Sequence, residues 1–361
     1  MSTLLEYKCP CCGGKLEFDS TLQQMKCPYC DNTIEVEALK ELDNELSAEQ
    51  PDSMPWQTGA GGEWGAGEAD GLKVYVCESC GGEIAADETT GASTCPYCDS
   101  PVVMKGSFAG SLRPDCLIPF KLNKEQAIAA LNEHLKGKKL LPKVFKQQNH
   151  IEEIKALYVP FWLFDAKAEA SMRYKGEKIR TWSRGNKEYT ETSHFALIRK
   201  GSIKFETVPV DGSSKVADDL MESIEPFDFR QAQDFQTAYL AGYLADKYDI
   251  SDEQCVERAN ERIKHSTEQK FEDTTRDFVG VTKQSGSIQL TDGKTRYALC
   301  PVWLLTTKWN GETFTFAMNG QTGKFVGNLP TDKGIFWRYF FGIGVTAAVL
   351  SYAVMFLIYL L

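Results

Sequence analysis

The stretch that decides the fold is VYVCESCGGEIAADETTGASTCPYCD, residues 74–99. It holds two CxxC pairs, Cys77 with Cys80 and Cys95 with Cys98, separated by the loop at residues 81–94. Two such pairs at this spacing are the ligand set of a structural Zn²⁺ site, because one tight turn presents both sulfurs of a pair to the metal. We therefore expect a small β zinc ribbon over residues 72–105.

The same pattern occurs near the N-terminus as YKCPCCGGKLEFDSTLQQMKCPYCD, residues 7–31. Here Cys11 and Cys12 compete for one ligand position, and the repeat decides between them: Cys12 aligns with Cys80, whereas Cys11 aligns with Ser79. This internal repeat predicts a second zinc ribbon over residues 1–40. The eight predicted metal ligands are Cys9, Cys12, Cys27, Cys30, Cys77, Cys80, Cys95 and Cys98.

The composition describes a folded, acidic chain. Of its 361 residues, 42% are hydrophobic and 25% charged, and the formal net charge is -10. Thiolate ligands and the other cysteines persist best in a reducing compartment, and the first ten residues contain no apolar signal-peptide core. We therefore expect the bulk of the chain to lie in the cytoplasm.

Residues 41–71 separate the two ribbons. This segment is acidic, rich in glycine and interrupted by Pro51 and Pro55, which predicts a flexible linker. Trp56 and Trp64 are unusual in such a segment. We favour their packing onto a neighbouring domain, and a short docking motif is the alternative.

Residues 106–330 mix helical and strand periodicity, which predicts an α+β domain. The run ALYVPFWLF at 156–164 and the run YALCPVWLL at 297–305 are expected strands. A helix should begin after Asn123, and Ser251 should open another with a capping box. Two acidic segments around 216–247 are also expected to be helices. The complete chain is thus expected to be multi-domain, with two zinc ribbons, an α+β domain and a C-terminal helix.

The last segment, residues 335–361, predicts a transmembrane helix that acts as a tail anchor. From Tyr339 to Leu361 no acidic or basic residue occurs, and this length crosses a hydrocarbon core of roughly 30 Å. Lys324, Lys333 and Arg338 precede it, which by the positive-inside rule keeps the N-terminal bulk in the cytoplasm. A buried core helix is the alternative, and the length of the run disfavours it.

Enzymatic and nucleic-acid functions find little support in the sequence. Four thiolates close the coordination sphere of Zn²⁺ and leave no position for a reactive water, so both sites are expected to be structural. The four histidines form no metal-binding or catalytic motif. Acidic residues outnumber lysines in both ribbons, so nucleic acid is an improbable partner.

Longer motifs resemble a bacterial family. The combination of the two ribbon motifs with VPFWLFDA at 159–166 and MNGQTGKFVGNLP at 318–330 is similar to proteins of Firmicutes labelled "TFIIB-type zinc ribbon-containing protein". The resemblance covers nearly the whole chain. A similar membrane-anchored zinc-ribbon protein occurs in some Bacillus operons beside a phage-shock protein A homologue. This resemblance implies a role in recruiting such membrane-stress proteins to the bilayer, and only the eight cysteine ligands carry over residue by residue.

These observations favour a non-enzymatic, tail-anchored adaptor that localises a protein partner at the cytoplasmic face of the membrane. The bilayer itself would be contacted through residues 339–361. One alternative is a membrane-associated nucleic-acid-binding or transcription-linked factor. A second is an enzyme whose site lies unrecognised within residues 106–330.

Overall fold

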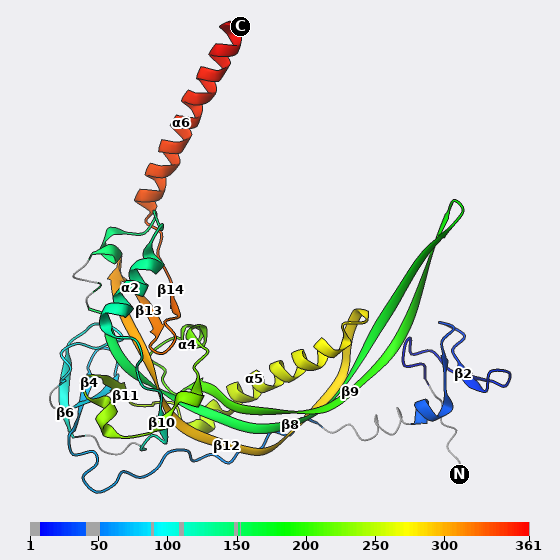
Figure 1. The fold of residues 1–361 in the computed structure, drawn as a ribbon, viewed down its shortest axis with the longest axis horizontal. Helices are drawn as coiled ribbons and strands as arrows, with labels where there is room; N and C mark the ends of the chain where they lie inside the picture. The colour runs from blue at the N-terminus through cyan, green and yellow to red at the C-terminus, as the bar shows by residue number, and fades with distance from the viewer. Residues whose placement is uncertain are drawn as a thin grey trace. The chain divides into compact units, whose positions relative to one another are not determined.

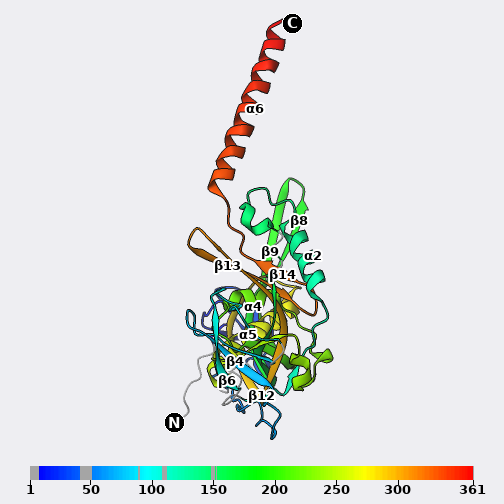
Figure 2. The same ribbon diagram turned by 90° about the vertical axis from the view of Figure 1, so that its left-hand side faces the viewer.

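The computed structural model describes residues 8–40, 51–87, 90–107, 112–147, 151 and 153–360. The chain forms two compact units, each assembled from separate segments (Figures 1 and 2). Unit 1 comprises Met1–Thr58, Phe164–Val208 and Val256–Thr295, and unit 2 comprises Gly59–Leu163, Pro209–Cys255 and Arg296–Leu361.

In the described chain, β-strand is the commonest regular secondary structure. The strands are β1 (Glu17–Asp19), β2 (Gln24–Lys26), β3 (Thr33–Ile34), β4 (Leu72–Cys77), β5 (Glu83–Asp87), β6 (Val102–Ser107), β7 (Cys116–Leu117), β8 (Lys155–Arg184), β9 (Lys187–Asp211), β10 (Gln233–Asp234), β11 (Leu244–Asp246), β12 (Val279–Trp309), β13 (Glu312–Asn319) and β14 (Phe325–Gly327). The α-helices are α2 (Lys124–Leu135), α4 (Asp218–Ile224), α5 (Asp252–Glu272) and α6 (Lys333–Leu360). The short 3₁₀ helices are η1 (Lys143–Lys146), η2 (Phe229–Gln231), η3 (Thr237–Leu240) and η4 (Asp273–Thr275).

Two sheets contain these strands. β1, β2 and β3 form a three-stranded antiparallel sheet around the first cysteine cluster. The other sheet has eleven strands, with the central order β10-β7-β12-β8-β11-β5-β4-β6. β13 and β14 extend it from β12, and β9 pairs with β8. β11 runs parallel to β8, and β7 runs parallel to β12.

Strand β8 changes character along its length. In Leu157–Phe164 every residue is buried, as a strand covered on both faces requires. From Ala166 to Tyr174 burial falls mainly on alternate residues, which is the period of a strand with one covered face. Strand β12 likewise contains a stretch that is covered on both faces, because every residue of Tyr297–Thr306 is buried. The change coincides with the division between the two units.

Helices supply the covering layers. In unit 2, α4 packs Met221 and Ile224 into one core, and α2 packs Leu131 and Leu135 into another. In unit 1, Ile263 of α5 packs against the alternating apolar side chains of β8 and β12. The expected strands at 156–164 and 297–305 are therefore confirmed.

The expected helix starts are also confirmed. Asn123 accepts a hydrogen bond from the N–H of Gln126, whose side chain accepts one from the N–H of Asn123. Ser251 and Gln254 form the same reciprocal pair. The second of the two expected acidic helices is wrong, because residues 229–246 form η2, η3 and two short strands. β11 is held between β8 and β5, and this sheet pairing overrides the local helical pattern.

The expected linker at 41–71 requires a correction in its second part. Residues 41–50 lie outside the described chain. Ser53 and Gln57 form bridges with β12, at Gln289 and Lys294. Gly293 is needed there, because a Cβ atom would meet the backbone oxygen of Pro55. Residues 51–58 are thus paired with the sheet rather than free.

The two tryptophans of this segment pack onto the body, as expected. Within unit 1, Trp56 contacts the ring of Phe164 edge-on at 5.0 Å, and its indole N–H donates to Asn260 Oδ1 at 2.8 Å. Within unit 2, Trp64 contacts the ring of Phe235 at 5.6 Å. Both tryptophan rings therefore have a structural role, although the glycine-rich sequence around them is typical of a flexible linker.

The expected α+β domain at 106–330 also differs from the structure. Strands β4, β5 and β6, from the second cysteine segment, belong to the same large sheet as β8 and β12. Residues 164–208 and 256–295 group instead with the N-terminal segment in unit 1. The reason is the length of β8 and β12, because each strand continues from one core into the next.

Candidate metal centres and the apolar C-terminal helix

Each CxxC pair is built on the same tight turn. The N–H of Cys77 donates to the carbonyl of Gly82 at 3.0 Å, and the N–H of Gly81 donates back to the carbonyl of Cys77 at 2.8 Å. Equivalent bonds close the turns that begin at Cys9, Cys27 and Cys95. The residue after the second cysteine has positive φ in all four turns, and these residues are Gly13, Asp31, Gly81 and Asp99. Glycine and aspartate are the residue types that tolerate this conformation best.

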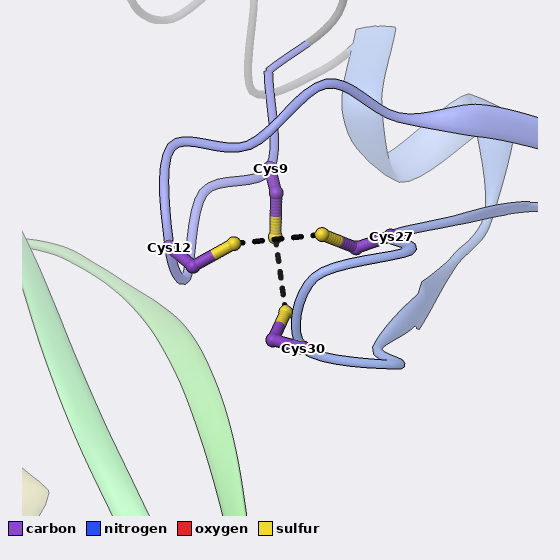
Figure 3. Close-up of side chains that lie close together, drawn as sticks. All are labelled: Cys9, Cys12, Cys27 and Cys30. Carbon is purple, nitrogen blue, oxygen red and sulfur yellow. Dashed lines mark hydrogen bonds between the residues drawn. The ribbon is translucent and has the colours of Figure 1, made fainter.

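The four sulfur atoms of each cluster converge. In the first cluster (Figure 3), Cys9 and Cys30 Sγ are 3.6 Å apart, and Cys12 and Cys27 Sγ are 3.4 Å apart. In the second, the corresponding distances are 3.5 Å for Cys77–Cys98 and 3.6 Å for Cys80–Cys95. Within each cluster all four ligand atoms lie within 4.8 Å of one another. The structure thus brings together all eight ligands that the sequence predicted.

These distances suit a tetrahedral metal ion. A Zn–S bond of about 2.3 Å places tetrahedral sulfurs about 3.8 Å apart, so a small outward movement would admit the ion. All twelve cysteines are free thiols, which leaves the eight cluster sulfurs available as ligands. The donor set therefore fits Zn²⁺, and its four thiolates would hold the ion without an open position for substrate.

Hydrogen bonding prepares one thiol of each cluster for metal binding. Burial opposes ionisation of Cys98, but the hydroxyl and N–H of Ser100 outweigh it and lower the pKa of Cys98 to about 6. For Cys27 burial is again opposed by backbone N–H groups, here of Tyr29 and Cys30, and the pKa falls to about 7. A thiolate is the form that binds metal, so each cluster offers a first ligand near neutral pH.

The first cluster is attached to strand β9 within unit 1. The side-chain amide of Asn32 donates to the carbonyl oxygen of His194 at 3.1 Å, and the Cys11 thiol contacts the same oxygen at 3.5 Å. Ile198 packs against the apolar residues of the cluster. Cys11, the cysteine that the repeat leaves without a ligand position, is therefore a buried docking residue.

Asn32→Ala should loosen this attachment without removing metal. The lost hydrogen bond is worth about 1 kcal/mol, so hydrogen exchange at residues 194–198 should accelerate roughly fivefold. Ser20→Ala, an exposed change in the turn between β1 and β2, is the matched control. Equal exchange in both variants would remove the docking role, and metal analysis of both proteins checks that the cluster is intact.

The second cluster is embedded in the core of unit 2. Cys77 and Cys95 are fully buried and belong to the same core as Leu157 and Val302. Lys155 of β8 donates to the carbonyl oxygen of Cys95 at 3.1 Å. Thr306 of β12 donates to the carbonyl oxygen of Pro96 at 3.0 Å. The two central strands of the sheet are therefore tied directly to this metal turn.

A buried carboxyl group lies beside the second cluster. Asp246 of β11 is 3% exposed, and neither carboxyl oxygen makes a well-formed hydrogen bond. Burial raises the pKa of Asp246 to about 7, and the hydroxyls of Ser213 and Tyr97 offset this only in part. The folded protein therefore holds a proton on Asp246 at pH values where the unfolded chain has lost it.

The raised pKa of Asp246 predicts that the free energy of unfolding depends on pH. Above the unfolded pKa of 3.8, folding must keep or take up the proton, so stability falls as pH rises towards the folded pKa of about 7. Asp246→Asn should therefore raise the free energy of unfolding by a few kcal/mol at pH 8 and by about half as much at pH 5.5. Thermal unfolding of both proteins at the two pH values measures the difference.

Asp249 provides the matched control for this experiment. Burial of Asp249 is outweighed by hydrogen bonds from Ser214 and by Lys215, which lower the pKa of the Asp249 carboxyl. Asp249→Asn should therefore destabilise the protein at pH 8, opposite in sign to Asp246→Asn. The same sign for both variants would contradict the assigned protonation of Asp246.

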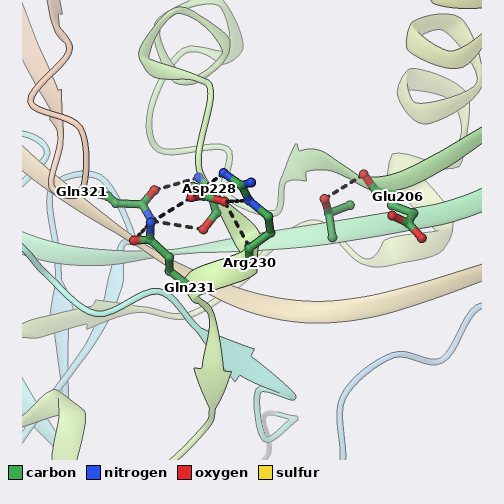
Figure 4. Close-up of polar contacts among 6 residues, drawn as sticks. Glu206, Asp228, Arg230, Gln231 and Gln321 are labelled. Atoms are coloured by element: carbon green, nitrogen blue, oxygen red, sulfur yellow. Dashed lines mark hydrogen bonds and ion pairs between the residues drawn. The ribbon is translucent and has the colours of Figure 1, made fainter.

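The motif MNGQTGK at 318–324 has a structural role. Asn319 is fully buried, and its side-chain amide donates to the carbonyl oxygens of Ile224 and Pro226. The Gln321 side chain bonds in both directions with the backbone of Asp228 (Figure 4). The turn after β13 thereby holds the loop after α4.

An open groove of about 580 Å³ lies in unit 2, within the range where the sequence left room for an enzyme site. His134, Asp219 and Ser223 are among its lining residues. Burial and the nearby charge of Lys138 lower the pKa of His134. The His134 Nε2 atom lies 3.3 Å from Lys138 Nζ, so the imidazole contacts the lysine ammonium.

Helix α6 is long and apolar enough to cross a membrane. It has 28 residues, a mean hydropathy of 2.1 in its most apolar window and no buried residue. The alternative of a buried core helix requires the opposite, because a core helix is covered by the chain. α6 begins at a well-formed cap, where Asp332 Oδ1 accepts the N–H groups of Gly334 and Ile335.

These features define a class: a sheet-rich protein with two four-cysteine clusters able to hold metal ions and one apolar C-terminal helix. No family model matches the chain, and no solved structure is significantly similar to it. The chain is 32% identical over 318 residues to the uncharacterized protein YdjG of Bacillus subtilis strain 168, covering 74% of this chain and 93% of YdjG. The chain therefore belongs to the YdjG family.

Proposed function

We propose that this protein is a non-enzymatic adaptor that is anchored in the cytoplasmic membrane by α6. Its two cysteine clusters hold structural Zn²⁺ in zinc ribbons, as in the TFIIB-type zinc ribbon-containing proteins that it resembles. The observation that carries the proposal is that α6 has no buried residue, whereas α2, α4 and α5 each bury side chains in a core. Such a helix needs an apolar solvent, and the bilayer supplies it.

The charges around the start of α6 support a cytoplasmic location for the body. Lys333 and Arg338 lie in its first two turns, and Lys324 precedes it. Basic residues at the end of a spanning helix favour the cytoplasmic side. The thiolate clusters require the same reducing side.

We propose that the partner binds at the tip of the β8–β9 hairpin. Within unit 1, residues 178–192 of this hairpin are exposed throughout. The rings of Trp182 and Tyr189 stack at 5.7 Å with an angle of 12°, and they remain 43% and 41% exposed. Arg180 lies over the Trp182 ring at 5.7 Å. Tryptophan, tyrosine and arginine are the residues that most often dominate protein–protein binding energy.

The adaptor proposal is tested by capture of a partner from the native cell with the zinc-loaded, detergent-solubilised full chain. Trp182→Ala with Tyr189→Ala should lower capture of a stoichiometric partner at least tenfold. Trp182→Phe with Tyr189→Phe keeps the stacked rings and is the matched control. We expect a membrane-stress protein similar to phage-shock protein A among the captured proteins. Retention of no stoichiometric protein by the native chain would overturn the adaptor proposal.

The same hairpin tip supports one alternative, binding of single-stranded nucleic acid. Lys178, Arg180, Arg184 and Lys187 accompany the two stacked rings, and bases stack on such aromatic platforms. Binding of this kind weakens steeply with salt. An oligonucleotide titration at low and high salt, with the same two hairpin variants, separates this alternative from the adaptor.

A further inference from the structure

The segment that follows α2 carries a concentrated positive charge. Residues 136–146, KGKKLLPKVFK, contain five lysines and no acidic residue, in a chain whose net charge is -10. We call these five residues the lysine patch: Lys136, Lys138, Lys139, Lys143 and Lys146. A local excess of this size on an acidic protein marks a surface for an anionic partner.

Packing fixes the lysines on the outside of this segment. Leu135, Leu141 and Phe145 are buried in the core beneath α2, so the backbone between them is held in place. Four of the five lysines are exposed, and Lys138 is half-buried. The Lys146 ammonium donates to the carbonyl oxygen of Lys138 at 2.8 Å, which closes the segment on itself. The patch is therefore a preformed surface.

The patch lies beside the start of α6. The N–H of Asp332, the cap residue of α6, donates to the carbonyl oxygen of Leu140 at 2.9 Å. Leu140 lies between α2 and η1, so this bond ties the lysine segment to the start of α6, which is labelled in both views (Figures 1 and 2). Lys333 and Arg338 add two positive charges on α6 itself. Two acidic residues close to the patch along the described chain already have partners: Asp332 caps α6, and Glu133 pairs with Lys136 at 3.2 Å.

The spacing along α6 matches the depth of a lipid headgroup layer. From Lys333 to Tyr339, where the uncharged run begins, the helix rises about 9 Å. Headgroups occupy roughly 5–8 Å on each side of the hydrocarbon core. Residues held at the first turn of α6 therefore reach the phosphate level, where an anionic leaflet attracts lysine most strongly.

From these contacts we propose that the lysine patch is a binding surface for the anionic lipid headgroups that surround α6. The inference rests on the proposed insertion of α6. It adds a lipid preference that holds unit 2 against the cytoplasmic leaflet. The occupant is the phosphate-bearing membrane surface rather than a soluble anion, because α6 fixes the patch at that surface.

The test uses the full chain in two kinds of nanodisc, one of phosphatidylcholine alone and one containing phosphatidylglycerol as well. Lysine acetylation followed by mass spectrometry measures how fast each ammonium reacts. Lys139 and Lys143 should react about fivefold more slowly in the anionic discs at low salt, and the difference should vanish at high salt. Lys105 is the internal control, because its side chain is 67% exposed and its strand, β6, lies away from α6 in both views.

Glutamine and arginine variants of the lysine patch separate the effect of its positive charge from the effect of side-chain size. Lys139→Gln, Lys143→Gln and Lys146→Gln together should abolish enrichment of phosphatidylglycerol in the lipid that co-purifies with the protein from mixed membranes. The same three positions changed to arginine retain the charge and should retain the enrichment. Equal enrichment in the glutamine and arginine variants would overturn the proposal.

The outcomes also distinguish failure of the proposed lipid binding by the lysine patch from failure of the proposed insertion of α6. A full chain that fails to enter either nanodisc would overturn the proposed insertion of α6 and the lipid-binding surface with it. A chain that inserts equally in both discs, with equal acetylation of Lys139 and Lys143, overturns the lysine patch alone. Protection by free phosphate in the neutral discs would assign the site to a soluble anion and would also count against the proposal.

Discussion

Serine in place of Cys77 and Cys95 should release one of the two metal ions and prevent unit 2 from folding. Both thiols are fully buried in the core that contains β8 and β12, and both belong to the second cluster. Structural zinc sites contribute about 10–16 kcal/mol, as much as or more than the 5–15 kcal/mol by which most domains are stable. Metal analysis should show the loss of one ion per chain, and limited proteolysis should show rapid digestion of unit 2.

The first cluster supplies the control for this result. Cys9→Ser with Cys27→Ser should also release one ion, but the damage should stay within the small sheet. Among the described residues, the apolar side chains around the first cluster come from residues 9–39, apart from Ile198 of the large sheet. Two double variants that unfold unit 2 equally would contradict this asymmetry, and so would unchanged metal content in either.

Removal of residues 339–361 should transfer the protein from the membrane fraction to the soluble fraction almost completely. The deleted run has no charged residue, and no other helix in the described part of the chain is long and apolar enough to cross a membrane. Insertion of such a helix is effectively irreversible, whereas the lysine patch alone gives only weak, salt-dependent attachment. Fractionation at low and high salt measures both contributions.

A single charged substitution within α6 is a second, less drastic test of membrane anchoring. Val349→Lys places a charge near the middle of α6, which costs about 2.5–3.5 kcal/mol on insertion scales. Val349→Leu changes the side chain at the same position without a charge and should insert normally. If the truncated protein, or the lysine variant, remained in the membrane fraction after a high-salt wash, α6 would not be the anchor.

Two continuous apolar runs explain why the strands were easier to predict than their grouping into units. The runs at 156–164 and 297–305 could be predicted as buried strands from the sequence. A continuous run of eight or nine apolar residues is unfavourable in water, so both faces of such a strand are expected to be covered. The sequence did not reveal that each run continues into a longer strand serving a second core. That property depends on partners such as Ile263 of α5, which lie far away along the chain.

For the predicted linker, the sequence suggested less structure than the protein has. Glycine, proline and acidic residues are typical of flexible chain, and this composition fits residues 51–71. The structure nevertheless pairs Ser53 and Gln57 with β12, and Trp56 donates to Asn260. The signal that could have indicated this was the presence of two tryptophans, which are too apolar to be left in water.

By itself the sequence determined the two four-cysteine clusters and the apolar helix, because both requirements are local. A metal turn needs two cysteines and a residue that tolerates positive φ, and a spanning helix needs an uninterrupted apolar run. Only the tertiary structure decided that the second cluster is part of a large core, that Cys11 docks on β9, and that five lysines lie at the base of α6. Each of these depends on contacts between residues far apart in the chain, such as Leu140 with Asp332, and no local pattern encodes which distant backbone groups will meet.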